Sequence, residues 1–302
     1  MDSVSIITVN YNQPQATIEL LLSLNKYATK NVEIIVVDNA SKVNHELKFK
    51  SIIPSLIFIR SEVNLGFAGG NNLGINLAKG DFIFLLNNDT EVSDGCIETM
   101  IDEFKANTKI GLLSPLILYY DDKSIIQYAG YTPLNYLNAR NSQIGQFEKN
   151  TGQYDHVSYE TGFCHGAAVM CRKADLLKAG LMDESYFLYY EELDWCEKFK
   201  QISKTINFTG KTFIYHKESL SVGKESKIKT YFMTRNRMLF IRKNTNIFNT
   251  FLFSVYYVLF ACSKMIFNYL KNGRKDLALH VIKALWWNFT HSKNSKSLGF
   301  KI

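Results

Sequence analysis

Three polar residues, Asn10, Asp38 and Asp89, each follow a short apolar run in the first ninety residues of the chain. The runs are rich in β-branched or aromatic residues and are typical of buried strands. In open α/β sheets, ligands bind beyond the carboxyl ends of the strands. Any one of these residues is equally well explained as a cap of a turn or helix. Three of them at three strand ends favour a binding site.

Asp89 completes the sequence Asn87-Asn88-Asp89, a polar turn after an apolar run. A carboxylate in such a turn suits Mg²⁺ or Mn²⁺ bound to a diphosphate, because phosphate oxygens and water supply the other ligands. Asn-Asn-Asp is also a common turn, so other residues must support a metal site. The 6 histidines form no H-x-x-x-H pair and the 5 cysteines form no C-x-x-C pair, so a zinc site is not expected.

An acidic segment contains Glu191, Glu192 and Asp194 and follows an aromatic stretch at residues 186–190. Acidic residues in the first turn of a helix often do no more than complement the helix dipole. A carboxylate among aromatic side chains is partly desolvated, which raises its pKa toward that of a useful general base. The segment is therefore a candidate for the base of a proton-transfer step.

The elements that would position these residues follow an alternating pattern, which indicates βαβ units and a largely parallel sheet. We expect no dinucleotide fingerprint in the Gly-rich segment 66–72, because it lacks G-x-G-x-x-G and no strand runs directly into it. Strands are predicted at residues 4–9, 33–37, 56–59, 82–86, 163–172 and 213–215, helices from residue 14 and at 69–78, 173–179 and 191–202, and loops or edge strands over 119–157.

Length and composition favour a folded protein of about two domains, since the chain has 302 residues of which 46% are hydrophobic. Charge is divided unevenly: residues 1–197 hold 15 basic and 25 acidic residues, a net charge of −10. Residues 198–302 hold 20 basic and 3 acidic residues, a net charge of +17, so the C-terminal third should face an anionic partner. No zinc-finger or RNP signature is present, so nucleic acid is not the expected partner, and a membrane surface or diphosphate is.

The C-terminal region contains an uncharged segment, residues 244–263, and a second apolar segment, residues 277–289, with Trp286 and Trp287. Lysines and arginines flank both. One interpretation is a pair of helices packed on the rest of the protein. Aromatic rings beside basic residues also suit an interfacial helix on anionic lipid. With no signal peptide expected at residues 1–10 and no disulfide pattern, we expect a cytoplasmic protein attached peripherally to the inner face of the cell membrane.

Five motifs in this order resemble those of a family 2 glycosyltransferase, most closely its bacterial rhamnosyltransferase-like branch. The resemblance covers about residues 4–245. The motifs are Val-Ser-Ile-Ile-Thr-Val-Asn-Tyr-Asn from residue 4, Val-Val-Asp-Asn-Ala-Ser from residue 36, Asn-Leu-Gly-Phe-Ala-Gly-Gly-Asn-Asn from residue 64, Leu-Leu-Asn-Asn-Asp-Thr from residue 85 and Tyr-Glu-Glu-Leu-Asp-Trp from residue 190.

This resemblance implies an α/β protein of the GT-A type, with a Rossmann-like mixed sheet flanked by helices and a C-terminal helical extension. It divides the chain into a catalytic domain at residues 1–245 and a membrane-associating helical segment at 246–302. The catalytic domain then has a nucleotide-sugar half at about 1–115 and an acceptor half at about 116–245.

The resemblance also implies roles for particular residues. Asn87-Asn88-Asp89 matches the D-x-D motif, with Asp89 as a metal ligand. His216 falls where related galactofuranosyl and rhamnosyl transferases place a metal-binding histidine. Glu192 matches the catalytic base, where the family usually has Asp; this departure leaves Glu191 as an alternative. The resemblance places Thr8, Asn10 and Asp38 on the nucleotide, with Asp38 on the base, and Asn64 and Asn71 on the ribose and diphosphate side. On physical grounds, Arg235 in Thr-Arg-Asn-Arg is expected to add a charge-assisted hydrogen bond to the leaving diphosphate.

The implied activity is an inverting, metal-dependent transfer of a sugar from a nucleotide diphosphate to a saccharide hydroxyl, with a lipid-linked acceptor and Mg²⁺ or Mn²⁺ as cofactor. The branch points first to L-rhamnose from dTDP-rhamnose, in cell-surface polysaccharide synthesis. A UDP-sugar donor and a non-catalytic sugar-binding protein are the alternatives. A nucleotidyltransferase is disfavoured, because the loop after the first predicted strand, Asn-Tyr-Asn-Gln-Pro, has no basic residue.

Overall fold

The β-branched runs at the start of the chain form the parallel half of a sheet. The computed structural model describes residues 2–27, 31–217 and 226–302. Neighbouring strands lie in the order β3-β2-β1-β4, and each of these pairings is parallel. The four strand predictions for this half are confirmed to within two residues at each end. The strands are β1 (Val4–Asn10), β2 (Val32–Asn39), β3 (Ile57–Ser61) and β4 (Phe82–Leu86).

The second half of the sheet is mixed, so the expectation of a largely parallel sheet holds only for the first half. Beyond β4 the order continues β9-β6-β10-β5, and β7 and β8 pair with β6 and β10. Only the β6–β10 pairing is parallel among the described strands of this half. Its strands are β5 (Thr90–Val92), β6 (Ile110–Tyr119), β7 (Ile126–Tyr128), β8 (Ser158–Glu160), β9 (Ala168–Arg172) and β10 (Thr205–His216).

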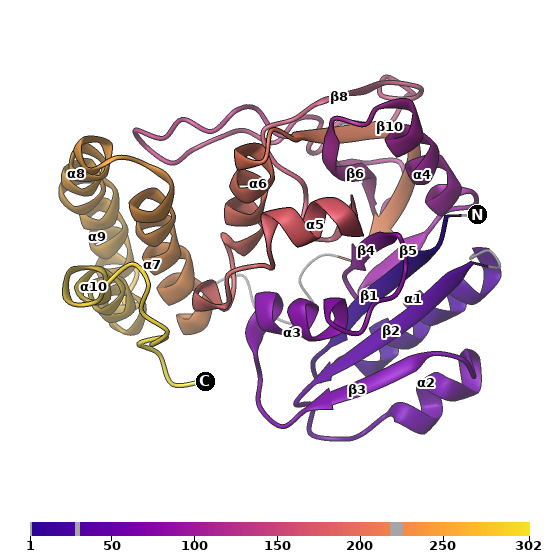
Figure 1. Cartoon of the computed structure of the whole chain (residues 1–302). Helices are drawn as coiled ribbons and strands as arrows, with labels where there is room; N and C mark the ends of the chain where they lie inside the picture. The colour runs from indigo at the N-terminus through magenta and orange to yellow at the C-terminus, as the bar shows by residue number, and fades with distance from the viewer. Residues whose placement is uncertain (1, 28–30, 218–225) are drawn as a thin grey trace.

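Helices cover both faces of the sheet (Figure 1). The apolar sides of α1, α2 and α4 pack with one set of strand residues, and those of α3, α5 and α6 pack with the opposite set. The predictions at 173–179 and 191–202 are confirmed, and the predicted strand at 163–172 is a strand only in its second half. The helices are α1 (Pro14–Tyr27), α2 (Glu46–Ile52), α3 (Gly66–Ile75), α4 (Cys96–Ala106), α5 (Lys173–Ala179), the 3₁₀ turn η1 (Glu184–Tyr186) and α6 (Glu191–Gln201).

The C-terminal helices gather at one end of the molecule, where Figure 1 shows them in orange to yellow. Helix α7 packs closely against α10, and a third core of buried apolar residues joins α7 to the helices that follow it. The motif analysis did not predict α7. The helices are α7 (Lys227–Asn244), α8 (Ile247–Tyr256), the π-helical turn η2 (Tyr257–Cys262), α9 (Ser263–Lys271) and α10 (Lys275–Thr290).

Gly74 allows α3 to lie directly on the first two strands. A Cβ at this position would meet Cγ2 of Ile7 and lie 3.2 Å from Cγ2 of Val37. We therefore expect Gly74→Ala to lower the free energy of unfolding by roughly 1–3 kcal/mol through overpacking. Urea denaturation measures this. Helix propensity alone would raise stability by about 1 kcal/mol, so an unchanged or higher unfolding midpoint would show that the contact is loose.

Candidate active site

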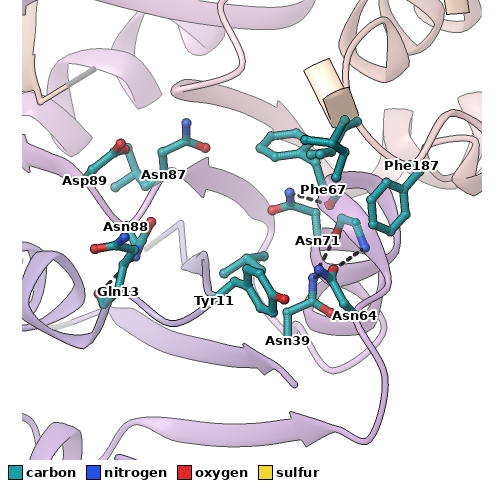
Figure 2. Close-up of a pocket in the computed structure, with 15 residues that line it drawn as sticks. Tyr11, Gln13, Asn39, Asn64, Phe67, Asn71, Asn87, Asn88, Asp89 and Phe187 are labelled. Atoms are coloured by element: carbon teal, nitrogen blue, oxygen red, sulfur yellow. Dashed lines mark hydrogen bonds between the residues drawn. The ribbon is translucent and has the colours of Figure 1, made fainter. Parts of the chain in front are cut away.

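A pocket of about 200 Å³ opens beyond the carboxyl ends of β1, β2 and β4. It is closed on one side by the start of α3 and by the loop that precedes α6, as Figure 2 shows. Five of the predicted site residues line it: Asn64, Asn71, Asn87, Asn88 and Asp89. The other lining residues are Val9, Tyr11, Gln13, Asn39, Gly66, Phe67, Leu86, Phe187, Leu188 and Ile228.

Amide side chains hold the loop between β3 and α3 against the end of β2. The Asn39 amide donates to Oδ1 of Asn64 at 3.1 Å and to the carbonyl of Gly66 at 3.0 Å. Its own oxygen accepts from the backbone N–H of Leu65 at 2.8 Å. The amide of Asn71 donates to the Phe67 carbonyl at 3.0 Å. The wall of the pocket is therefore neutral, polar and already hydrogen-bonded.

Thr8, Asn10 and Asp38 lie beneath the pocket and do not line it. Asn10 donates to Oγ of Ser41 at 3.0 Å and accepts from Oγ1 of Thr17 at 3.0 Å, so both ends of its amide are occupied. Oδ1 of Asp38 accepts the Ser41 N–H at 2.9 Å. These two residues thus support the loop after β2. Within the described part of the chain, Oγ1 of Thr8 and Oδ2 of Asp38 are buried without a hydrogen-bond partner.

Asp89 and His216 meet although 126 residues separate them in the sequence, because β5 pairs antiparallel with the end of β10. The register places His216 opposite Thr90. Nε2 of His216 then lies 3.2 Å from Oδ1 of Asp89, and both side chains are buried. Burial raises the pKa of Asp89. The hydrogen bond and charge of His216 lower it by more than burial raises it, so the pKa lies below its usual value.

Gln127 fixes the other side of the His216 ring. Its Oε1 lies 2.8 Å from Nδ1 of His216, so Nδ1 carries the donated proton. In the tautomer that carries its only ring proton on Nδ1, Nε2 and the facing Oδ1 of Asp89 would both be available to bind one cation beside them. His165 packs edge-on against His216 with ring centroids 5.8 Å apart, and burial, with His216 next, lowers its pKa to about 3.

Glu192 and Glu191 begin α6, but their surroundings differ. Glu191 is 2% exposed, whereas Glu192 is half-buried. Glu192 does not line the pocket; it and the lining residue Phe67 both approach Gly166, where a Cβ would lie 3.9 Å from Cγ of Glu192 and 3.7 Å from Cζ of Phe67. Burial raises the pKa of both carboxyls, and for Glu191 the Glu192 charge raises it further. Oε2 of each has no hydrogen-bond partner among the described residues.

Arg235 does not reach the pocket, contrary to the prediction that it binds the diphosphate. Its side chain is fully buried and donates to backbone carbonyls, including that of Leu298 at 2.7 Å and that of Tyr186 at 3.1 Å. Its Nε donates to Oδ1 of Asn236 at 2.8 Å. The guanidinium lies 4.8 Å and 4.7 Å from the ring centroids of Phe232 and Trp287. The side chain is engaged in packing α7.

Several residues of the site were not singled out by the sequence analysis. Asn39 follows Asp38 directly and belongs to the same motif, so that motif was the available signal. Phe187 lies in the aromatic stretch before the acidic segment. Gln127 and His165 gave no signal, because only the pairing of β6, β7, β9 and β10 brings them to this corner.

Comparisons with known proteins agree with this geometry. A low-salt glycan biosynthesis hexosyltransferase of Haloferax volcanii is 27% identical over 244 residues, which cover 79% of this chain and 75% of that protein. An N-acetylglucosaminyl-diphospho-decaprenol L-rhamnosyltransferase of Mycobacterium tuberculosis is 21% identical over 243 residues, 74% of this chain and 79% of that protein.

The fold is also found in solved structures. The crystal structure of GalNAc-T7 with UDP, GalNAc and Mn²⁺ matches with a TM-score of 0.68 at 15% identity, over 96% of this chain and 56% of that one. The mixed sheet with helices on both faces is the GT-A fold, as expected from the motifs. The family model described as glycosyl transferase family 2 matches residues 5–176. The chain therefore belongs to glycosyl transferase family 2 and is a glycosyltransferase.

Proposed function

We propose that the protein transfers a sugar from a nucleoside diphosphate to a saccharide hydroxyl, with inversion at the anomeric carbon. One observation carries the proposal: a pocket with five asparagines in its lining has an aspartate–histidine pair at one end, and Glu192, whose Oε2 lacks a hydrogen-bond partner among the described residues, lies near Gly166 as the lining residue Phe67 does. The first group suits the leaving diphosphate, and the second suits the attacking hydroxyl. A non-catalytic sugar-binding protein would have no need of either.

Asp89 and His216 fit a divalent cation, Mg²⁺ or Mn²⁺. Nε2 of His216 lies 3.2 Å from a buried carboxylate oxygen of Asp89, and Gln127 lies on the other ring nitrogen, where metal-binding histidines usually have a partner. No group of three or more His, Cys, Asp or Glu that could hold a metal occurs in the described ranges, so diphosphate and water would complete the shell. Such an ion neutralises charge on the departing diphosphate.

The pocket lining itself supplies little positive charge. Among the described residues that line it, none is Lys or Arg. The proposed cation at Asp89 and His216 would therefore supply the positive charge that a bound diphosphate needs. Asn64, Asn71, Asn87 and Asn88 would orient the donor through neutral hydrogen bonds.

Asp38 and Thr8 are proposed to contact the nucleotide base after a small rearrangement of the loop above them. Oδ2 of Asp38 and Oγ1 of Thr8 are buried without a hydrogen-bond partner among the described residues, although Nη1 of Arg60 lies 3.9 Å from Oδ2, and a ligand would offset the cost of these missing bonds. A carboxylate oxygen accepts the imide N–H that uracil and thymine share. Asn10 supports the same loop from below.

Glu192 is proposed as the general base. Its raised pKa makes the carboxylate a better proton acceptor, and both it and the pocket residue Phe67 lie near Gly166. The oxygen of the acceptor gives its proton to Glu192 and attacks the anomeric carbon from the face opposite the diphosphate. One displacement inverts the configuration, and no covalent sugar–enzyme intermediate forms.

L-Rhamnose from dTDP-rhamnose is the proposed donor, and a lipid-linked saccharide the proposed acceptor. The mycobacterial relative is named as a rhamnosyltransferase that acts on a decaprenol-linked sugar. UDP-sugars come second, because GalNAc-T7 was crystallised with UDP. A panel of nucleotide sugars, read by release of the nucleoside diphosphate, tests donor and activity together. No release from any donor by the metal-loaded protein would overturn the proposal.

The C-terminal helices are proposed to attach the protein to the inner face of the cell membrane. Among the described residues, Ile247–Lys271 is one helix long and apolar enough to cross a membrane by length and composition. Its Phe253 and Tyr257 pack into the protein core, while Phe248 and Phe251 on α8 are more than 60% exposed. A helix with one packed and one exposed apolar face suits an interface better than a span.

Exposed aromatic residues also occur on α10, where Trp286 and Phe289 are 68% and 61% exposed. Exposed lysines accompany them: Lys264, Lys271, Lys275 and Lys283. Lysines near an anionic bilayer contribute about 1 kcal/mol each. Peripheral docking of this face would bring a lipid-linked acceptor and the enzyme to the same surface.

Asp89→Asn and His216→Ala should each lower metal-dependent turnover roughly a hundredfold or more, the effect of losing a preorganised electrostatic contact. Both variants should keep a cooperative melting transition. His45→Ala, on the far side at the start of α2, serves as the control and should behave as wild type. Full activity of His216→Ala would show that the histidine only pairs with Asp89.

Glu192→Gln should lower the rate of sugar transfer roughly 10²–10⁴-fold. Calorimetry should show unchanged binding of the nucleoside diphosphate, because only the proton acceptor is lost. In the wild type, turnover should fall as the pH drops through a pKa above the usual value of about 4.3, since only the ionised carboxylate accepts a proton. If Glu191→Gln is the inactive variant and Glu192→Gln is active, the base is Glu191.

Replacing Phe248, Phe251 and Trp286 together by Ser should reduce flotation with anionic vesicles at least tenfold, because the surface that would enter the headgroup region is removed. Turnover of a water-soluble acceptor should not change. Leu47→Ser, which alters an 87% exposed residue on α2 at the other end of the molecule, is the control. Equal flotation of all three proteins, or none by the wild type, would show that the helices serve packing alone.

A further inference from the structure

The loop that closes the pocket, residues 187–190, is held in a conformation that its residues resist. Phe187, Tyr189 and Tyr190 have φ angles of 65°, 69° and 75°. Positive φ is unfavourable for aromatic residues, which have a Cβ and no local hydrogen bond to compensate. Such residues persist only where the surrounding structure holds them, and they concentrate at functional sites. The question is which groups hold this loop.

The loop forms two parts of the proposed site. Phe187 and Leu188 line the pocket, and the Phe187 carbonyl accepts the Phe67 N–H at 2.7 Å. A Cβ at Gly66 would collide with that carbonyl, so the start of α3 and the loop lie in direct contact. The loop then leads straight into α6, whose second residue is Glu192. Its conformation therefore sets both a pocket wall and the origin of the base.

Asn236 on α7 donates to one carbonyl just before this loop and to two within it. Its amide nitrogen lies 2.9 Å from the carbonyl of Tyr186, 2.7 Å from that of Leu188 and 2.8 Å from that of Tyr189. The side chain is fully buried. Two N–H groups shared among three carbonyls make a dense local anchor, and the carbonyls of Leu188 and Tyr189 would lose this donor if Asn236 were removed.

Arg235 fixes the orientation of that amide. Its Nε donates to Oδ1 of Asn236 at 2.8 Å, so the amide nitrogen must face the loop. Its Nη2 donates to the carbonyl of Tyr186 at 3.1 Å and also to that of Ser185. Aromatic rings of Phe232 and Trp287 hold the guanidinium plane. These hydrogen bonds of the buried cation go to carbonyl and amide oxygens, and within the described part of the chain no carboxylate pairs with it.

We propose that Arg235 and Asn236 form a clamp that positions the 187–190 loop, and through it the donor pocket and Glu192. They are positioning residues and touch neither donor nor acceptor. The catalytic role of the loop rests on the proposed function. The clamp itself rests only on the contacts described above. In this proposal Arg235 does not contact the diphosphate. It affects catalysis by holding the loop in place.

The matched pair for the test is Asn236→Ala and Asn288→Ala. Asn288 on α10 is also a buried asparagine, and its amide donates to the carbonyls of Arg235 at 3.0 Å and Ala284 at 3.1 Å. Its hydrogen bonds go to α7 and to its own helix, and not to the described residues of the loop. Both substitutions remove the same atoms from buried amide–carbonyl bonds, so both should lower the melting temperature.

Only Asn236→Ala should raise KM for the nucleotide sugar and lower kcat, with at least a tenfold loss in kcat/KM. Chymotrypsin should also cleave it faster after Tyr189 or Tyr190, because the strained loop relaxes. Arg235→Lys, which keeps a cationic donor, should fall between wild type and Asn236→Ala in both measurements and keeps the test open if Asn236→Ala does not fold.

Equal kinetics and equal cleavage of Asn236→Ala and Asn288→Ala would overturn the clamp. A wild type that neither binds nucleoside diphosphate nor turns over any nucleotide sugar would instead overturn the proposed function. In that case the cleavage rates alone decide on the clamp, because they need no substrate.

Discussion

The short antiparallel pairing between β5 and the end of β10 is the interaction on which the proposed chemistry depends. β5 has three residues, and it pairs with the last three residues of a strand that begins more than a hundred residues later. This register brings His216 to Asp89. The backbone N–H of Lys217 then donates to the Asp89 carbonyl at 2.9 Å, which fixes the turn from the other side. A shift of one residue would turn His216 to the opposite face of the sheet.

The other residues of the site leave Asp89 and His216 as the place where the charge of a diphosphate would be balanced. Five of the fifteen residues that line the pocket are asparagines, and Asn39, Asn64 and Asn71 among them hydrogen-bond to one another or to the backbone. Neutral amides orient a ligand without a large desolvation cost, but they do not compensate a diphosphate. Positive side chains nearby are already occupied: Lys217 pairs with Glu19 and Glu91, and Arg60 donates to the Ser41 carbonyl. Compensation at Asp89 and His216 is consistent with this arrangement.

Local sequence patterns predicted the parts of the fold that local physics determines. The strands around Asp38 and Asp89 and the helix at Glu191 are short apolar or amphipathic runs with clear ends, and they were placed within two residues. The resemblance in turn supplied Glu192 and His216 as candidates. What the sequence did not show depends on pairing across long separations, as for Gln127, which reaches His216 only because β7 pairs with β6.

Helix α7 and Arg235 show a second kind of limit. Buried residues of α7 face both the loop and α10, so its apolar residues mark no single face and give no clear helical stripe. An arginine in a basic C-terminal third was readily interpreted as a ligand for phosphate. The sequence does not reveal that the side chain is buried among carbonyls, because its partners come from the loop before α6 and from the C-terminal segment near Leu298.

Helix α7 belongs to the basic part of the chain, residues 198–302, and contacts the acidic part, residues 1–197. Its first turn contributes Ile228 to the pocket, its middle contacts the 187–190 loop, and its later turns pack against α8 and α10. The exposed apolar surface of α8 and α10 is consequently fixed in direction relative to the pocket by one continuous helix. For an enzyme whose acceptor is anchored in a bilayer, as proposed, this rigidity matters more than affinity for lipid. Docking would then fix the direction from which the acceptor reaches Glu192. Helix α7 would position both the docking surface and the loop that precedes Glu192.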